Sequence, residues 1–499
     1  MRLTGSFHTK VTQPGSVASA SSATVVGSTV GASDIPQGYA VPAPSPGAVD
    51  AHRPRAGSQA RPYADAVTTS TALLTDHYEL TMIEAALRSG AATRRCVFEL
   101  FARRLPEGRR YGVVAGTGRF LEALAGFRFD AVALEQLART KVVDEATLAW
   151  LSDYRFTGDI SGYAEGEAFF PGSPVLVVES GFAEGVVLET LALSILNHDS
   201  AVAAAASRMT SAAGDRPCIE MGSRRTHEEA AVASARAAYL AGFAATSNLE
   251  AGRRYGVPTT GTAAHAFTLV HDTEEEAFAA QLAALGTGTT LLVDTYDVTH
   301  AVETAVRLAG PDLGAVRLDS GDLLVLARQV REQLDALGNE RTRIIVTSDL
   351  DEYAIAALAA GPVSGYGVGT SLVTGSGAPT AGMVYKLVLR SNDDGLMEPV
   401  AKKSKDKTSV GGRKWALRRR NTTGTAEAEI IGIGEAPHDD GDDRPLMVDL
   451  VRDGSVIADT SVQAARERHH ASREELPASA RQLQKGEPVI PTVYLGGAS

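Results

Sequence analysis

Seven short apolar runs recur between Cys218 and Gly369, and helical patterns separate most of them. Apolar runs of this length are typical of buried strands. Strands that alternate with helices predict a parallel sheet with right-handed crossovers. About seven units in roughly 150 residues suit an incomplete, irregular α/β barrel better than an open sheet. The predicted strands lie near 218–222, 243–247, 257–262, 290–294, 314–318, 343–347 and 365–369.

Polar residues gather where these predicted strands end. The strand ends of an α/β barrel share one face, and active sites form on that face. We therefore expect one site built jointly by several strand ends. The candidates are Arg224 and Arg225; Ser247 and Asn248; Thr262 and His265; Asp294 and Asp297; Asp319, Ser320 and Asp322; Ser348, Asp349 and Asp351; and Gly367, Gly369 and Thr370.

The glycine-rich segment 365–370 predicts an anion site at the last strand end. Glycines let backbone N–H groups approach a phosphate closely, and a helix that starts next adds its dipole. A flexible turn is the alternative interpretation. The lysine-rich run 402–407 is typical of a solvated loop, and it could also line a polyphosphate site.

Arg317 and Asp319 surround another predicted strand end. Arginine can bind a phosphate or a carboxylate with two N–H groups, and aspartate can hold ribose hydroxyls or magnesium. An ion pair with a helix cap at Ser320 is the alternative. His265 is a candidate base, or a nucleophile toward phosphate. The commoner role of a lone histidine is structural.

The remaining segments predict an α+β region beside the barrel. Helical spacing begins after Thr75-Asp76 and ends near Gly90, and an apolar strand follows at 96–101. Further helices are expected at 112–124, 144–151 and 183–209, with a small antiparallel sheet at 158–178. We divide the chain into a disordered extension at 1–68, an N-terminal α+β domain at 69–210, the catalytic barrel at 211–390 and a C-terminal subdomain at 391–499.

Composition excludes several classes of protein. The formal net charge of -12 argues against a general nucleic-acid or anionic-membrane binder, because either needs a basic face. Two cysteines cannot form a disulfide framework, so we expect a reducing, cytoplasmic location. The sequence has no run of about 18 apolar residues, so we expect no membrane span. Residues 1–68 are rich in Ser, Ala, Gly and Pro, which indicates disorder, with targeting as the alternative.

Seven short motifs follow one another in a fixed order. They are Thr75-Asp76-His77-Tyr78, Phe98-Glu99-Leu100-Phe101, Gly222-Ser223-Arg224-Arg225, Thr246-Ser247-Asn248, Gly261-Thr262-Ala263-Ala264-His265, Arg317-Leu318-Asp319-Ser320-Gly321-Asp322 and Gly367-Val368-Gly369-Thr370. Each motif is modest alone, whereas the ordered set is highly specific. The set resembles the nicotinate phosphoribosyltransferase family over nearly all of residues 71–495.

This resemblance implies a roughly seven-stranded α/β barrel joined to an α+β domain, as a homodimer with shared active sites. The implied reaction joins nicotinate to phosphoribosyl pyrophosphate and yields nicotinate mononucleotide and pyrophosphate. ATP is the implied co-substrate, hydrolysed through a phosphohistidine at His265, and Mg²⁺ is the implied cofactor.

The resemblance also implies roles for single residues. Arg224 and Arg317 would bind the nicotinate carboxylate or a phosphate. Asp319 and Asp349 would hold the ribose or the metal. Gly369 and Thr370 would hold the 5′-phosphate, and Gly367 is a further residue expected to bind substrate. Tyr78 would stack on the pyridine ring of a neighbouring subunit's site.

Two positions depart from the family pattern. Met221 stands where the family usually has a stacking phenylalanine, and a thioether can replace ring stacking at modest cost. Ser348 stands where the family commonly has glycine.

Three alternative functions fit the sequence less well. A nicotinamide phosphoribosyltransferase would carry an acidic residue at Ser247, and serine there favours the acid substrate. A catalytically silent phosphate-binding scaffold does not explain His265, Arg317 and Asp319 together. A barrel lyase would need a Schiff-base lysine, and none lies at the predicted strand ends.

Overall fold

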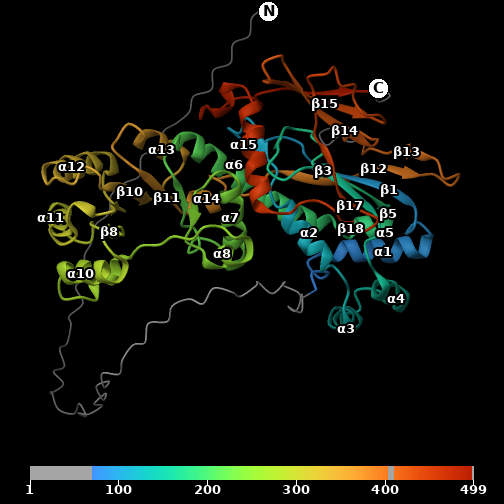
Figure 1. Cartoon of the computed structure of the whole chain (residues 1–499). Coiled ribbons are helices and arrows are strands. Elements are labelled where there is room, and N and C mark those ends of the chain that lie inside the picture. Colours follow the sequence, from blue (N-terminus) through green and yellow to red (C-terminus); the bar gives the residue numbers. More distant parts are fainter. Residues whose placement is uncertain (1–69, 403–408, 497–499) are drawn as a thin grey trace, which may run out of the picture. The chain divides into compact units, whose positions relative to one another are not determined.

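A six-stranded parallel sheet forms the centre of the predicted barrel region (Figure 1). The computed structural model describes residues 70–402 and 409–496, all within one unit, Val67–Ser499. The predictions for residues 1–68 and for most of the run 402–407 lie outside the described residues. Neighbouring strands are parallel in the order β7-β6-β11-β10-β9-β8. The strands are β6 (Cys218–Glu220), β7 (Ala245–Thr246), β8 (Thr290–Leu292), β9 (Ala315–Leu318), β10 (Arg343–Ser348) and β11 (Gly365–Val368).

The segment predicted as a seventh strand, 257–262, does not form one. It meets β7 through a single parallel bridge between Thr246 and Thr259. Thr246 N–H donates to Pro258 O at 2.9 Å, and Thr260 N–H donates to Thr246 O at 2.9 Å. Proline has no N–H to donate, so the pairing cannot extend on that side. The sheet therefore stays open between β7 and β8, as an incomplete barrel.

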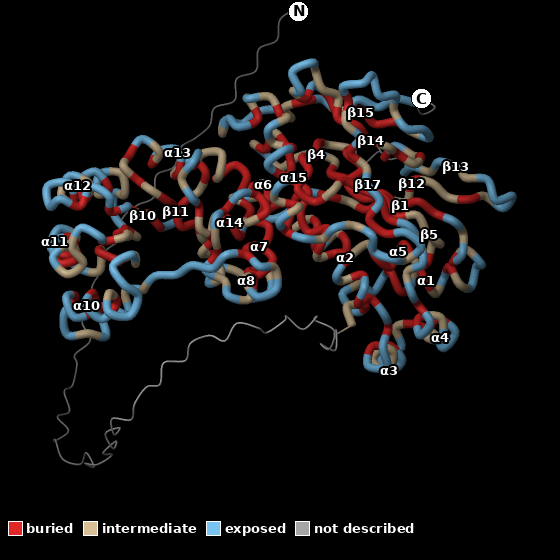
Figure 2. The backbone as a smooth tube through the Cα atoms, in the orientation of Figure 1, coloured by how far each residue is buried: buried red, intermediate tan, exposed pale blue. Residues whose placement is uncertain are grey.

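Helices follow the strands and pack on the sheet. Val316, Ile344 and Val346 are fully buried, as expected for strands covered on both faces. The helices α10, α11 and α12 bury one side and leave the other exposed (Figure 2). The helices of this region are α7 (Glu228–Leu240), α8 (Leu249–Tyr255), α9 (His265–Leu269), α10 (Glu274–Leu285), α11 (Val298–Ala309), η1 (Gly310–Asp312), α12 (Leu323–Ala336), α13 (Glu352–Leu358) and α14 (Thr370–Val373).

Most N-terminal elements follow the sequence prediction with shifted ends, whereas the helix α3 (Ala131–Thr140) was not predicted. The helix predicted at 112–124 begins only at Thr117, because Gly112 and Val113 pair with β4 as β2. Gly90 ends α1 with a left-handed φ of 78°, which glycine adopts readily. The elements are α1 (His77–Ser89), β1 (Arg95–Ala102), β2 (Gly112–Val113), α2 (Thr117–Ala125), α3 (Ala131–Thr140), α4 (Glu145–Asp153), β3 (Asp159–Tyr163), β4 (Ala168–Phe169), β5 (Leu176–Gly181), α5 (Phe182–Val186) and α6 (Glu189–Ala213).

A seven-stranded antiparallel sheet joins the two ends of the chain. Its order is β13-β12-β1-β5-β3-β17-β18, so blue and green strands lie beside orange and red ones (Figure 1). Strands from both sides of the predicted boundary at residue 390 therefore share one sheet. The later elements are β12 (Met383–Ser391), β13 (Met397–Pro399), β14 (Lys414–Arg420), β15 (Ala426–Ile433), β16 (Arg444–Pro445), β17 (Met447–Arg452), β18 (Ser455–Val456), α15 (Val462–Glu475), η2 (Ala478–Arg481) and β19 (Thr492–Leu495).

The stretch Phe182–Ala213 is long and apolar enough to cross a membrane by length and composition alone. In the fold, 61% of its most apolar window is buried. It includes α6, which packs against α7, α2 and α13. Burial among other helices is expected of a helix in the core of a folded domain. Apolar length alone does not distinguish such a core helix from a membrane span.

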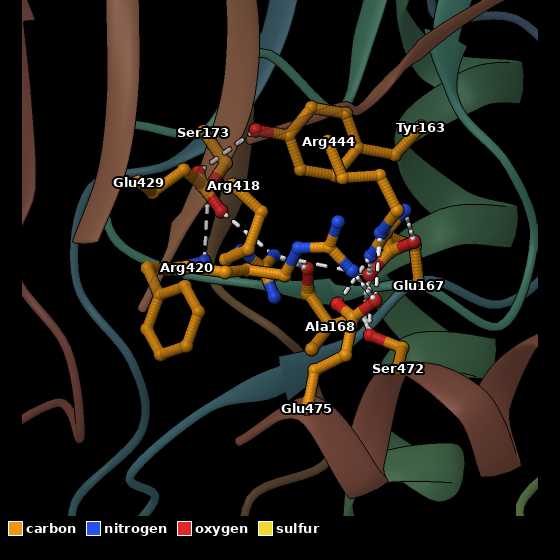
Figure 3. A network of polar contacts seen from close by, with 11 residues as sticks. Tyr163, Glu167, Ala168, Ser173, Arg418, Arg420, Glu429, Arg444, Ser472 and Glu475 are labelled. Atoms are coloured by element: carbon orange, nitrogen blue, oxygen red, sulfur yellow. Dashed lines mark hydrogen bonds and ion pairs between the residues drawn. The ribbon is translucent and has the colours of Figure 1, made fainter. Parts of the chain in front are cut away.

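A buried ionic network ties β14 and β15 to the N-terminal region and to α15 (Figure 3). Arg418 is fully buried and donates to Glu429 at 3.0 Å and to Ala168 O at 2.8 Å. Arg444 binds Glu167 with two hydrogen bonds, at 2.9 and 3.0 Å, and Glu475 with two more. Buried charges must be paired to be tolerated, so the network holds these segments in one arrangement.

Candidate active site

A cavity of ≈ 200 Å³ lies at the carboxyl ends of β6, β9, β10 and β11. Parallel strands point the same way, so their ends meet on one face. Eight of the eleven predicted site residues line this cavity. Its lining consists of Met221, Arg224, Arg225, Arg317, Asp319, Thr347, Ser348, Asp349, Gly367, Gly369 and Thr370.

Arg317 is the most buried guanidinium of the cavity, with a side chain 13% exposed. Its Nη1 donates to Thr262 Oγ1 at 2.7 Å and to Ala263 O at 3.3 Å. Its Nη2 lies 3.6 Å from Asp319 Oδ1. Burial lowers the pKa of Arg317, and the nearby carboxylates of Asp319 and Asp294 oppose that change. The loop that leads to His265 thus fixes the guanidinium inside the cavity.

Arg224 and Arg225 lie in the loop after β6, and both are exposed. Neither side chain has a hydrogen bond or an ion pair to the residues that the structure describes, although the Arg225 backbone N–H donates to Gly222 O at 2.8 Å and Arg224 repels Arg317 electrostatically. Three guanidinium groups therefore face one cavity, two of them without a carboxylate partner. Such a set is suited to bind anions with charge-assisted hydrogen bonds.

Two aspartates lie on either side of His265. Its Nε2 is 3.9 Å from Asp294 Oδ1 and 3.9 Å from Asp319 Oδ2. Its Nδ1 lies 3.1 Å from Thr295 Oγ1. The imidazole is 39% exposed at the start of α9, so a ligand can reach it. His265 does not line the cavity itself, but it contacts Asp319, which does.

Asp294 is almost fully buried, with a side chain 3% exposed. Its Oδ2 accepts hydrogen bonds from Asp319 N at 2.9 Å and from Ser320 Oγ at 2.7 Å. Its Oδ1 is buried and has no hydrogen-bond partner among the described residues. Because a buried carboxylate oxygen normally has a partner, Oδ1 is available to an imidazole N–H or a cation.

The glycines of the last strand end leave room for a ligand. A Cβ on Gly367 would clash with Thr347 Cγ2 and would lie 2.8 Å from Met221 Sδ, so a side chain does not fit there. Gly369 precedes the single turn of α14, where Thr370 Oγ1 lies 3.5 Å from Asp349 Oδ1. This arrangement exposes backbone N–H groups to an anion in the cavity.

Besides His265, two predicted site residues lie outside the cavity. Ser247 is exposed in the loop after β7, and its N–H donates to Glu220 O at 2.8 Å. Tyr78 lies on α1 with 46% of its surface exposed. Burial and the carboxylates of Glu189 and Glu79 raise the pKa of Tyr78 to about 12.

Two threonines of the site were not predicted from the sequence. Thr347 contacts Asp319 Oδ1, and Thr295 contacts His265. Thr347 fell within a predicted strand and Thr295 just beyond one, where a threonine is ordinary. The only available signal was their position at strand ends, which does not distinguish a ligand from a packed residue.

A sequence model of the nicotinate phosphoribosyltransferase (NAPRTase) N-terminal domain matches residues 73–197. Nicotinate phosphoribosyltransferase pncB1 of Mycobacterium tuberculosis (strain CDC 1551 / Oshkosh) is 62% identical over 429 residues, 84% of this chain and 94% of the relative. The chain belongs to the nicotinate phosphoribosyltransferase family of enzymes. The nicotinate phosphoribosyltransferase of Bacillus subtilis (strain 168) is 37% identical over 375 residues, 73% of this chain and 76% of the relative.

Solved structures agree with the fold of this family member. Human nicotinic acid phosphoribosyltransferase superposes with a TM-score of 0.73 at 26% identity, covering 84% of this chain and 97% of the other. Nicotinate-nucleotide pyrophosphorylase from Pyrococcus furiosus gives a TM-score of 0.67 at 21% identity, covering 83% and 98%. The second likeness concerns the fold alone. The fold class predicted from the sequence is confirmed.

Ser348 takes a backbone conformation typical of glycine. Its φ is 154°, and Leu350 N–H donates to Ser348 O at 2.9 Å. Residues other than glycine reach this region only with strain. The backbone thus keeps a glycine conformation at the position where the family commonly has glycine.

Proposed function

We propose that the cavity binds nicotinate and phosphoribosyl pyrophosphate and joins them into nicotinate mononucleotide, releasing pyrophosphate. The observation that carries the proposal is the convergence of Arg224, Arg225 and Arg317 on one cavity. Both substrates are anions, one a ring carboxylate and the other a phosphate ester. This reaction is a step of NAD biosynthesis. A cytoplasmic location belongs to the same proposal.

The chemistry requires positioning and charge stabilisation more than proton transfer. The pyridine nitrogen bonds to the anomeric carbon, while the bond from that carbon to pyrophosphate breaks and its electron pair leaves with pyrophosphate. The sugar becomes cationic between these events, so fixed charges govern the rate. Asp319 and Asp349 are suited to the ribose, and Gly367, Gly369 and Thr370 to the 5′-phosphate.

Magnesium fits the oxygen donors on this face. Asp319 Oδ2 and the unpartnered Asp294 Oδ1 lie equally far from His265 Nε2, and carboxylate oxygens are the ligands that Mg²⁺ prefers. Asp319 is the residue that we assign to the metal. When bound, Mg²⁺ would neutralise charge on the leaving pyrophosphate.

Removal of the most buried guanidinium tests the function directly. Arg317→Gln should lower formation of nicotinate mononucleotide about 100-fold, as expected when a charged stabilising donor is lost. Arg307→Gln is the matched control, since Arg307 is exposed and, among the described residues, its side chain pairs only with Glu275. Equal rates in the two variants would contradict a catalytic cavity at Arg317.

ATP coupling through His265 is part of the proposal. An imidazole nitrogen of His265 would attack the γ-phosphorus of ATP, forming a P–N bond while the P–O bond to ADP breaks. The imidazole N–H proton can pass to the carboxylate of Asp294 or Asp319, both 3.9 Å from Nε2. Added negative charge beside Asp319 would then favour a bound cation and the pyrophosphate that it holds.

The phosphohistidine has a chemical signature. Protein incubated with γ-labelled ATP should carry an acid-labile, base-stable label. His265→Ala should lose both that label and the stimulation by ATP, while a slow ATP-independent reaction survives. A label of undiminished strength on His265→Ala would assign phosphorylation to another residue.

A homodimer with shared sites accounts for Tyr78, which lies on α1 away from the cavity of its own chain. Mixed Tyr78→Ala and His265→Ala chains should regain activity, because one hybrid site keeps both residues. Failure to regain activity, with subunit exchange proven by differently tagged chains, would contradict shared sites.

A further inference from the structure

Glu220 is a buried carboxylate directly beneath the loop that carries Arg224 and Arg225. It ends β6 and is 0% exposed. One oxygen, Oε1, accepts the N–H of Gly222, and the other, Oε2, contacts the hydroxyl of Thr246. No arginine or lysine pairs with it in the part of the chain that the structure describes. Burial raises the pKa of Glu220, and the hydrogen bonds from Thr246 and Gly222 oppose that change.

Thr246 is the register partner of Glu220 on the neighbouring strand β7, and it is also 0% exposed. Its Oγ1 accepts the N–H of Asn248 at 2.9 Å. The side-chain Nδ2 of Asn248 then donates to Ser223 Oγ at 3.0 Å. Ser247, between Thr246 and Asn248, donates its N–H to Glu220 O at 2.8 Å.

These contacts tie the loops after β6 and β7 together. One loop follows β6 and carries Met221 and the paired arginines, and the other follows β7 and carries Ser247. The first loop has little room to move, because a Cβ on Gly222 would clash with Val373 Cγ1. An uncompensated buried carboxylate is tolerated only while its donors stay in place. The carboxylate therefore favours the one arrangement in which both loops contact it.

We infer that Glu220 and Thr246 are positioning residues that set the spacing between the arginine pair and Ser247, and so the selection of a carboxylate-bearing ring. This inference rests on the proposed function. Neither residue touches substrate, and each acts through the loop that it holds. The hydrogen bonds that join Glu220, Thr246, Asn248 and Ser223 together form a clamp between the two loops. Loss of this clamp moves the arginine pair relative to Ser247. It leaves the glycine-rich loop after β11 and the region of His265 unchanged.

A matched set of threonine variants tests the clamp. Thr246→Val removes the hydroxyl and keeps the shape, whereas Thr246→Ser keeps the hydroxyl. Thr342→Val is the control, because Thr342 is equally buried and its hydroxyl donates to Leu313 O at 2.9 Å, at the opposite end of β10. All four proteins are assayed with nicotinate, nicotinamide and phosphoribosyl pyrophosphate, and their melting temperatures are measured.

Thr246→Val should raise the KM for nicotinate about tenfold, because the hydroxyl that joins Glu220 to the loop after β7 is lost. Its preference for nicotinate over nicotinamide should fall by a similar factor. The KM for phosphoribosyl pyrophosphate and the kcat should stay within about twofold of the wild type. Thr246→Ser should restore the KM for nicotinate, and Thr342→Val should leave it unchanged at a comparable loss of melting temperature.

Parallel changes in every kinetic parameter of Thr246→Val and Thr342→Val would overturn the inference in favour of a structural role. Ser223→Ala decides the matter if Thr246→Val does not fold, since it removes only the outer hydrogen bond of the clamp. It should raise the KM for nicotinate alone, and an unchanged KM would overturn the inference. A wild-type protein that neither binds nor converts nicotinate would overturn the proposed function, and the clamp with it.

Discussion

Asp294 points one carboxylate oxygen at His265, with Oδ1 3.9 Å from Nε2, while its other oxygen holds the backbone N–H of Asp319 at 2.9 Å. A single buried side chain thus links the two residues to which we assign phosphoryl transfer and metal binding. Because Oδ1 has no other partner among the described residues, small movements of the imidazole suffice to complete a hydrogen bond.

Asp294→Asn should lower the ATP-stimulated rate about 100-fold, in the range expected for loss of a proton-accepting group. The amide oxygen can still accept the N–H of Asp319, so the slow ATP-independent rate should fall much less. The measurement is the initial rate with and without ATP. An equal loss in both rates would contradict a role for Asp294 at His265.

Ser348→Gly should raise the stability of the protein. Strain at φ 154° costs about 1–3 kcal/mol, and glycine adds about 0.5–1 kcal/mol of chain entropy to the unfolded state, so a net gain of about 1 kcal/mol is expected. Ser89→Gly, in the last turn of α1, should lower the stability instead. Urea unfolding of both variants measures the difference, and two losses would show that Ser348 is unstrained.

The buried imidazole of His469 should make the folded protein less stable in acid. Both ring nitrogens are buried without a hydrogen-bond partner among the described residues, and burial lowers the pKa of His469 to about 3. The unfolded chain, with a histidine pKa of about 6.5, binds this proton first as the pH falls. Stability from His469 is therefore complete above pH 6.5 and decreases as the pH falls toward 3.

His469→Leu should make the free energy of unfolding less dependent on pH across this window. The difference between pH 7 and pH 4 should shrink by about 2–3 kcal/mol relative to the wild type. His470→Leu, the exposed neighbour on α15, should leave the difference unchanged. Equal pH dependence in the wild type and His469→Leu would show that His469 does not titrate in this way.

The network of Figure 3 makes a different prediction. Arg418→Met leaves the buried carboxylate of Glu429 without its cation, which should destabilise the protein by about 3–5 kcal/mol. The double variant Arg418→Met with Glu429→Gln removes both charges, so it should be more stable than the single variant. Chemical unfolding of the three proteins tests the order, and a double variant less stable than the single one would contradict it.

Local patterns predicted the barrel strands well because β9, β10 and β11 are short apolar runs bounded by helices. The same reasoning was wrong for 257–262, where an apolar start precedes proline and threonine and only one bridge forms. The pairing of β1 with β12 joins residues almost 300 positions apart. Local periodicity contains no information about such partners.

The candidate site, like the fold, has a part that the sequence predicted and a part that it did not. The positions of Arg317, Asp319 and Gly367 at strand ends were enough to predict that these residues lie together, and all three line one cavity. The hydrogen bonds from the Thr246 hydroxyl to Glu220 and from Asp319 N to Asp294 depend on register between neighbouring strands, which the sequence pattern does not specify. The location of Tyr78 relative to a second chain depends on assembly, and it stays a prediction.

One assay tests the central claim most directly. Purified protein is incubated with phosphoribosyl pyrophosphate and either nicotinate or nicotinamide, with and without ATP, and the mononucleotide products are quantified. We expect nicotinate mononucleotide as the product and a rate increase with ATP. Nicotinamide should give at least about 30-fold less product, because the loss of a contact to a buried charge costs about 2 kcal/mol or more. Equal turnover of the two rings, or no nicotinate mononucleotide under any condition, would contradict the account.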